Sequence, residues 1–399
     1  MPSGFRIVGI SDIAEKPLVI SRFTRAVEEV HQPFFGGQEV LAPPDLRAPF
    51  APAIGQRITE PGLAERWRLQ DDQYRAEARI SRFWMTSIAD ATVYPPFGIV
   101  AQGGRLVRDT IRHGRMLGSI FPGQRAESFQ EAMGTPGMEL RGATPEIARR
   151  VPGHTFLLGY GVYENYFNWI LRYASRVAMY QAMPQPCRLV VPAPVKPYVA
   201  ETLEFLGVPR GQVEYLDEPL AFERLTLMSP FAIGRYELSP LIVSTLRGHP
   251  NVTGLPRGPR RRLYIPRRNV RMRTVVNQAA VESALRRLDF EIFDNAEYSV
   301  REQAQAFRDA AIIVAPHGAG LANIVWCDAG TPVIELVPEG YDQGVTSYRS
   351  LADLFGLRYA QLFAREAAPD RKGNRCNADI ELDVLELARA IQVMLTRQG

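Results

Sequence analysis

Cysteine is scarce in this chain of 399 residues. The three cysteines, Cys187, Cys327 and Cys376, lie far apart and lack C-x-x-C spacing, which excludes a disulfide framework and a zinc site of the usual kind. No stretch approaches the roughly 18 consecutive apolar residues of a membrane span. The N-terminus also lacks the charged-then-apolar pattern of a signal peptide. We therefore expect a cytoplasmic protein without a membrane span.

Lysine is equally scarce. Of the 47 basic residues only Lys16, Lys196 and Lys372 are lysines, so 44 are arginines, although the net charge is only +4. Eight arginines fall between Arg257 and Arg273, and guanidinium groups suit bidentate phosphate binding. The segment predicts an anionic ligand, with a solvated charged surface as the alternative. A nucleic-acid partner is disfavoured, because only one aromatic residue is interleaved with these arginines.

The distribution of apolar residues predicts an α/β protein. Residues 1–80 are rich in Pro and Gly and have weak periodicity, with a helix expected only near 61–82. A Gly-Gly turn inside 91–106 predicts an antiparallel hairpin. Further on, expected strands alternate with expected helices, which is typical of a parallel sheet covered by helices. The strands are expected at 155–159, 188–191, 213–215 and 224–228, and the helices at 165–181 and 195–206.

A second alternating region follows residues 248–260, which hold three Pro and three Gly and no apolar period and are therefore the best candidate for a linker. The pattern beyond it predicts a doubly wound α/β domain. Its strands are expected at 263–265, 291–293, 312–315, 333–336 and 359–362, and its helices at 275–288, 300–310, 321–327, 347–355 and about 382–395. The predicted organisation is an N-terminal extension at 1–85, an α/β domain at 86–247, the linker, a nucleotide-binding domain at 261–380 and a closing helix at 381–399.

The sharpest motif is the segment from Ile312 to Asn323, where a buried strand runs into a Gly-rich turn that opens a helix. Gly318 and Gly320 would let the backbone approach a ligand, and the helix N-terminus would offer N–H groups to a phosphate. His317 could add a hydrogen bond. Because the spacing matches neither G-x-G-x-x-G nor a Walker loop, a purely structural turn is the alternative.

Two further features point to the same edge of the predicted sheet. The strand at 263–265 is followed by Arg267, Arg268, Arg271 and Arg273, which could neutralise a diphosphate. Glu335 lies near the end of another strand and could accept a hydrogen bond from a ribose hydroxyl. A helix cap or a salt bridge to an arginine is the alternative for this glutamate.

These residues carry a resemblance to a known family. Tyr264 to Arg268, the motif Pro-His-Gly-Ala-Gly-Leu-Ala-Asn at 316–323 and Val-Ile-Glu-Leu-Val-Pro at 333–338 resemble the family 61 glycosyltransferases, which include capsular polysaccharide enzymes of bacteria. The resemblance is specific over about 260–360 and looser upstream. It implies two facing Rossmann-like domains of the GT-B type and sugar transfer with inversion. The donor would be a nucleotide sugar, for which we expect a UDP-sugar, the acceptor would be a glycan, and no metal would be required.

The resemblance and the arginine cluster together assign a donor site in the second domain. The assigned residues are Arg267, Arg268, Arg271, Arg273, His317, Gly318, Ala319, Gly320, Asn323 and Glu335. The residues assigned to the acceptor side belong to the first domain and are Asn165, Asn168, Trp169 and Arg172.

The acceptor side also holds a departure from the family pattern. Members typically have a His where this chain has Asn168 and an acid where it has Arg172. Inverting transfer needs a base for the acceptor hydroxyl, and neither an amide nor a guanidinium can serve. Glu164, His154 and His317 are the candidate catalytic residues. A catalytically silent subunit that binds a nucleotide or a glycan is the alternative function.

Overall fold

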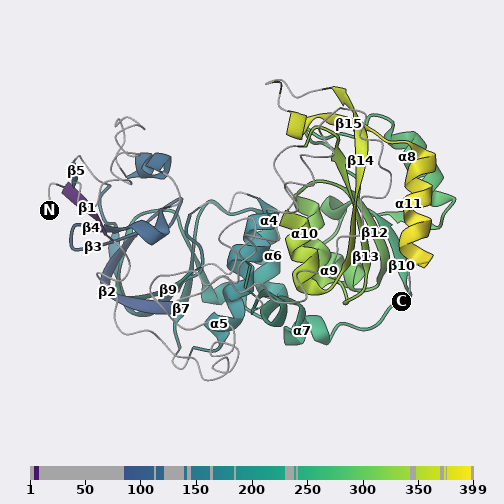
Figure 1. Cartoon of the computed structure of the whole chain (residues 1–399). Helices are drawn as coiled ribbons and strands as arrows, with labels where there is room; N and C mark the ends of the chain where they lie inside the picture. Colours follow the sequence, from purple (N-terminus) through teal and green to yellow (C-terminus); the bar gives the residue numbers. More distant parts are fainter. Residues whose placement is uncertain are drawn as a thin grey trace. The chain divides into compact units, whose positions relative to one another are not determined.

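The chain folds into two compact units (Figure 1). The computed structural model describes residues 4–8, 85–111, 114–120, 139–141, 145–161, 165–183, 186–229, 238–239, 241–341, 347–368, 373 and 375–396. Residues up to 229 form the N-terminal unit, and those from 238 onward form the C-terminal unit. The helix expected near 61–82 and the candidate base Glu164 lie outside the described residues.

The N-terminal unit is built on one mixed sheet, whose described strands run in the order β5-β1-β4-β3-β2-β9-β6-β7-β8. They are β1 (Gly4–Val8), β2 (Met85–Tyr94), β3 (Ile99–Gln102), β4 (Arg105–Val107), β5 (Glu139–Arg141), β6 (Arg149–Leu157), β7 (Arg188–Pro192), β8 (Val213–Leu216) and β9 (Leu220–Met228). The predicted hairpin is confirmed: β2, β3 and β4 are antiparallel neighbours, with Gly103 and Gly104 at positive φ in the second turn.

The four strands predicted to form a parallel sheet are confirmed as parallel: they are β9, β6, β7 and β8. The sheet as a whole is mixed, because β2 pairs antiparallel with β9 along its whole length. The entry hairpin therefore extends the sheet instead of forming a separate module. β1 joins the same sheet beside β4, although residues 1–80 were expected to be irregular.

The predicted helix at 165–181 is helical but not continuous. It consists of α4 (Tyr166–Asn168), the π-helical turn η6 (Trp169–Tyr173), the 3-10 turn η7 (Ala174–Arg176) and α5 (Val177–Gln181). The buried Arg176 donates to the carbonyls of Met228, at 2.5 Å, and Leu158, so it ties this helical segment to the ends of β9 and β6. Burial lowers the pKa of its guanidinium. α6 (Pro197–Phe205) follows β7 as predicted.

The C-terminal unit has the predicted doubly wound sheet, in the order β11-β10-β12-β13-β14-β15. Its strands are β10 (Arg261–Tyr264), β11 (Phe290–Ile292), β12 (Ala310–Pro316), β13 (Pro332–Pro338), β14 (Arg358–Ala368) and β15 (Asp379–Glu381). All pairs are parallel except β14 with β15. Sequence analysis did not predict β15, which is only three residues long.

Helices cover both faces of this sheet (Figure 1). On one face lie α8 (Gln278–Arg286) and α11 (Val384–Thr396), and on the other α9 (Val300–Arg308), η11 (Ala319–Trp326) and α10 (Ser347–Phe355). Val281 of α8 and Ile391 of α11 pack with Val314 and Ile334 of the sheet in one buried core. η11 is a 3-10 helix where an ordinary helix was expected at 321–327. No described helix has the length and apolarity needed to span a membrane.

The predicted linker belongs to the C-terminal unit. The π-helical turn η9 (Val243–Arg247) and α7 (Pro250–Thr253) occupy this region, and Leu246, Val252 and Leu255 are buried. His249 caps α7 by accepting from the N–H of Asn251, and Pro250 begins the helix, a position that suits proline. The boundary between the units thus lies between 229 and 238, upstream of the predicted 247, because Pro and Gly here begin and end short helical turns.

Candidate functional site

The site lies where the chain reverses direction across the C-terminal sheet. β10 and β12 are neighbours, but β10 leads through α8 to β11 on one side, while β12 leads through η11 to β13 on the other. Ligands of doubly wound sheets bind at the carboxyl ends of strands at such a switch point. The loop after β10 carries Arg267 to Arg273, and the loop after β12 carries His317 to Gly320. The two motifs identified in the sequence are therefore brought together.

Gly318 makes room for a guanidinium group. A Cβ at this position would overlap Nη1 of Arg267, so the arginine lies directly against the glycine backbone. The φ of Gly318 is 172°, which is extended backbone open to any residue. The glycine is therefore required by the close approach of Arg267 and not by an unusual φ. Tyr348 of α10 fixes the turn by donating its hydroxyl proton to the Gly318 carbonyl at 2.6 Å.

Arg267 and Arg273 form a pair of positive charges without a described acidic partner. The pKa of Arg267 is lowered to about 10, first by burial and then by the charge of Arg273. The Nε atoms of both side chains are buried and have no hydrogen-bond partner. Arg273 donates to Oδ1 of Asn377 at 3.1 Å, and its φ of 57° is a left-handed conformation that is costly for a residue other than glycine. This arrangement would be stabilised by an anion between the two guanidinium groups.

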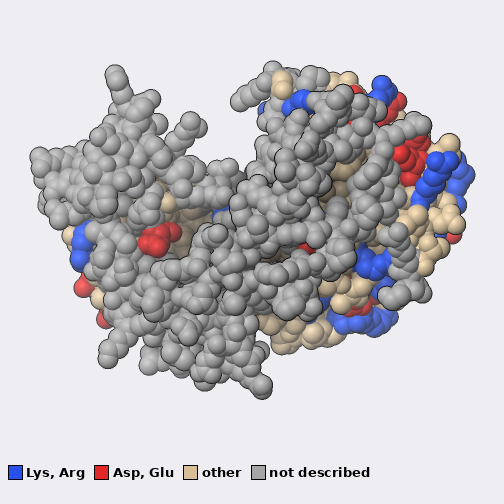
Figure 2. Space-filling model, in the orientation of Figure 1, with Lys and Arg blue, Asp and Glu red and all other residues tan. Residues whose placement is uncertain are grey.

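Most other arginines of the cluster are already neutralised. Arg268, whose side chain is 45% exposed, pairs with the 9% exposed Glu282 at 2.6 Å, while Arg257 and Arg261 pair with Asp328 and Glu291. Arg271 is exposed. Figure 2 likewise shows blue and red side chains interspersed over the visible part of the C-terminal unit. Of the four arginines predicted after the first strand, only Arg267 and Arg273 thus have the burial and the uncompensated charge of a binding pair.

His317 is held by a buried glutamate. Nδ1 of the imidazole hydrogen-bonds Oε1 of Glu335, and Glu335 is fully buried. The other carboxylate oxygen of Glu335 accepts from the hydroxyl of Tyr359. The hydroxyl of Tyr341 lies 3.2 Å from Nε2 of His317. The predicted contact of Glu335 with a ribose is therefore not supported, because its carboxylate is enclosed and is used to orient His317.

Three other predicted donor-site residues are placed differently. Asn323 is fully buried. It donates to Oε1 of Gln303 at 2.7 Å and accepts from Nε1 of Trp326 at 3.0 Å, so its contacts stabilise η11 within the protein. The carbonyl of Gly320 accepts a hydrogen bond from Nδ2 of Asn295 at 3.1 Å. A Cβ at position 320 would lie 2.8 Å from the same nitrogen. Ala319 is partly exposed beside the site.

Tyr341, Tyr348 and Tyr359 were missed by sequence analysis. Tyr341, in the segment after β13, lies beside Nε2 of His317, and Tyr348 of α10 bonds the Gly318 carbonyl. Tyr359 of β14 donates to Glu335, which holds His317. Isolated tyrosines in apolar segments look like ordinary core residues in a sequence. The parallel register of β13 with β14, in which Glu335 pairs with Gln361, brings Tyr359 to Glu335. Tyr341 and Tyr348 reach the motif from the segment after β13 and from α10.

The predicted acceptor-side residues lie together on one helical segment but have local structural contacts. Asn165 caps α4 by accepting from the N–H of Asn168 at 2.9 Å. Trp169 is fully buried, so its ring does not reach a ligand. Arg172 lies in the π-helical turn. The candidate base His154 sits on β6, with Nε2 at 2.5 Å from Oγ1 of Thr226.

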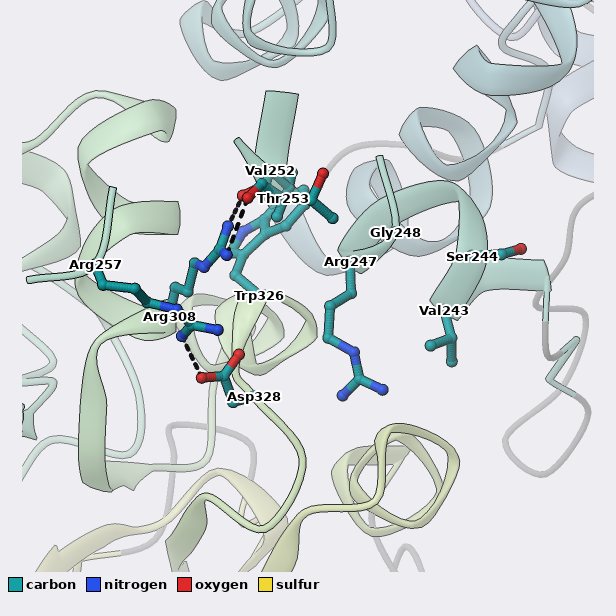
Figure 3. A pocket seen from close by; sticks show the side chains of 10 residues that line it. All are labelled: Val243, Ser244, Arg247, Gly248, Val252, Thr253, Arg257, Arg308, Trp326 and Asp328. Carbon is teal, nitrogen blue, oxygen red and sulfur yellow. Dashed lines mark hydrogen bonds and ion pairs between the residues drawn. The ribbon is translucent and has the colours of Figure 1, made fainter. Parts of the chain in front are cut away.

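A cavity of about 530 Å³ at the other edge of the C-terminal sheet has a structural explanation (Figure 3). Its arginines are engaged by the protein itself: Arg247 donates to the carbonyl of Phe355 at 2.7 Å, Arg308 donates to the carbonyls of Val252 and Thr253, and Arg257 pairs with Asp328. These bonds fasten η9 and α7 to the ends of α9, α10 and η11. Among the described residues, no cluster of His, Cys, Asp and Glu could hold a metal ion.

The C-terminal unit thus has a doubly wound sheet with two neighbouring guanidinium groups, those of Arg267 and Arg273, at its switch point. Residues 166–334 match the family model Glycosyltransferase 61. This match confirms the resemblance to the family 61 glycosyltransferases that the sequence motifs predicted, and it supports glycosyltransferase activity. The matched segment runs from α4 to β13 and includes Arg267, Arg273, His317 and Gly318. A comparison with curated proteins gave no match.

Proposed function

We propose that this glycosyltransferase takes its sugar from a nucleoside diphosphate sugar, most simply a UDP-sugar, and transfers it to a glycan acceptor with inversion. The observation that carries the proposal is the pair Arg267 and Arg273 at the switch point, both with buried Nε atoms and without a described carboxylate partner. A diphosphate would supply the missing negative charge. Both guanidinium groups could donate charge-assisted hydrogen bonds to its oxygens.

The chemistry follows from that placement. The acceptor hydroxyl attacks the anomeric carbon, the bond from that carbon to the diphosphate oxygen breaks, and the hydroxyl proton passes to a base. Negative charge grows on the leaving diphosphate, and fixed guanidinium groups stabilise it most in the transition state. His317, adjacent to Gly318 and oriented by Glu335, is placed to hydrogen-bond the same leaving group. We assign His317 to the donor side. The base that accepts the proton of the acceptor hydroxyl would then come from the N-terminal unit, where Glu164 and His154 are the candidates.

The wider assignments belong to the same proposal. We infer that the two compact units correspond to the two Rossmann-like domains of a GT-B enzyme. We infer further that transfer needs no metal, because Arg267 and Arg273 supply the positive charge, and that the product is a bacterial surface or capsular polysaccharide made in the cytoplasm. The catalytically silent subunit is favoured only by the replacements at Asn168 and Arg172.

Two neighbouring arginines provide a matched test. Arg267→Met should weaken UDP binding by about 10-fold to 150-fold, the loss of one hydrogen bond between charged groups at about 1.5–3 kcal/mol. Arg268→Met removes the same charge one residue later. It should change the affinity less than about 3-fold, because Arg268 is paired with Glu282, and Glu282 keeps Gln278 and Arg286 as partners.

Isothermal titration of UDP into the wild type and both variants measures the difference. Equal affinities in all three proteins, or a loss confined to Arg268→Met, would contradict the proposed donor site.

A further inference from the structure

The N-terminal unit contains a small cavity of about 270 Å³ that none of the preceding assignments uses. Its walls come from the loops that follow β2, β6 and β7 and from the first turn of α6. Phe97 and Tyr198 supply aromatic rings, Pro96, Pro194 and Val199 supply apolar surface, and Lys196 supplies a charge. Its volume is just below that of typical ligand cavities, which run from about 300 to 1,000 Å³, so only a small ligand fits.

The cavity is held in shape by the backbone. The N–H of Gly161 donates to the carbonyl of Phe97 at 2.7 Å, so the loop after β2 is fastened to the loop after β6. Gly98 has a φ of +64°, and a Cβ there would lie 2.5 Å from the Gly159 carbonyl and 2.8 Å from Cγ of Pro192. This close approach draws the loop against the end of β7 as well. A cavity formed by three fastened loops is preformed, which lowers the entropic cost of binding.

Its lining is selective in two respects. Tyr198 is fixed by an edge-on contact with Tyr166 of α4, with ring centroids 5.3 Å apart, so one wall is a rigid aromatic surface beside the segment that begins the family match. Lys196 is exposed, forms no ion pair with the described residues, and is one of only three lysines in the chain. In a protein with 44 arginines, a lone ammonium suits a single anionic group rather than a bidentate diphosphate.

We propose that this cavity binds one sugar unit of the acceptor, and that Lys196 selects an acceptor sugar bearing one anionic substituent, such as the carboxylate of a uronic acid. This inference rests on the proposed function, since a transferase needs a second substrate. The C–H face of a pyranose ring packs on aromatic rings, and its polar edge stays at the mouth with the charged group. The volume admits a single sugar unit.

The test compares two probes that differ only in charge, methyl β-D-glucuronide and methyl β-D-glucoside, by titration followed with saturation-transfer NMR. The wild type should bind the glucuronide at least 5-fold more tightly than the glucoside. Lys196→Met should abolish this preference and leave glucoside binding unchanged. Tyr198→Ala should weaken both probes at least 5-fold.

Arg210→Met is the matched control, because it removes an exposed cation of the same unit that is paired with Glu204. It should keep the wild-type preference. A preference that survives Lys196→Met, or the absence of binding of both probes to the wild type, would overturn the proposal. UDP titrations of the same proteins separate the two proposals. If the wild type does not bind UDP, the donor site is contradicted. The acceptor cavity is decided by the glycoside titrations alone.

Discussion

At the scale of single residues, Gly318 and Arg267 act as one unit. We predict that Gly318→Ala weakens UDP binding by about the same 10-fold to 150-fold as Arg267→Met, because one methyl group would occupy the space of Nη1 of Arg267. The protein should stay folded, since the displaced group is the end of a flexible side chain.

A double-mutant cycle measures this coupling. If both substitutions act through the guanidinium, the variant carrying both should bind UDP no more weakly than either single variant. Additive losses would show that Gly318 approaches the ligand itself, independently of Arg267.

Glu335 is the second residue whose function depends on a neighbour. Glu335→Gln keeps the shape of the side chain but removes the negative charge beside Nδ1 of His317. We predict that kcat falls at least 10-fold while the UDP affinity changes less than 3-fold, because the histidine acts on charge that develops during transfer. Steady-state kinetics with a UDP-sugar and titration with UDP measure the two effects.

Tyr359→Phe is the control for this prediction. It removes the hydroxyl that donates to the other oxygen of Glu335 but leaves the carboxylate charge and its bond to His317. Its kcat should stay closer to the wild type than that of Glu335→Gln. The reverse order would mean that Glu335 serves the packing of the sheet and not His317.

At the scale of elements, Asn323 connects α9 to η11. Its amide bonds Gln303 of α9 and Trp326 at the end of η11 in a fully buried setting. We predict that Asn323→Ala lowers the free energy of unfolding by about 1–3 kcal/mol, since buried polar partners are left unsatisfied. Urea unfolding checks this. UDP affinity at a temperature where the variant is folded should change less than 3-fold, and a selective loss of binding would restore Asn323 to the donor site.

At the scale of the whole molecule, UDP binding should be confined to the C-terminal unit. We predict that UDP, more than GDP, raises Tm in the presence of a metal chelator, by an amount equivalent to about 2.7 kcal/mol at 100 times Kd. Hydrogen exchange should show new protection at 265–273 and 317–320 and none around the cavity of the N-terminal unit. Stabilisation that appears only with a divalent cation would contradict the metal-free donor site.

The doubly wound C-terminal sheet and the resemblance to family 61 could be predicted from the sequence. Apolar runs alternating with amphipathic segments have few other solutions, and the motif at 316–323 carries the resemblance together with Tyr264 to Arg268 and the segment 333–338. The sequence also predicted where β10 and β12 end, and hence that Arg267 and His317 share one edge of the sheet.

Which charges remain available for a ligand depends on contacts that form only in the folded chain. Arg267 and Arg268 are adjacent and chemically identical in the sequence, but one lies against Gly318 and the other pairs with Glu282. Glu335 orients His317 because the register of β13 buries it beneath the imidazole, and the supposed linker joins the C-terminal unit through Arg247 and Arg308. Charge compensation depends on neighbours that lie far away in the chain, and folding alone brings them within hydrogen-bond distance.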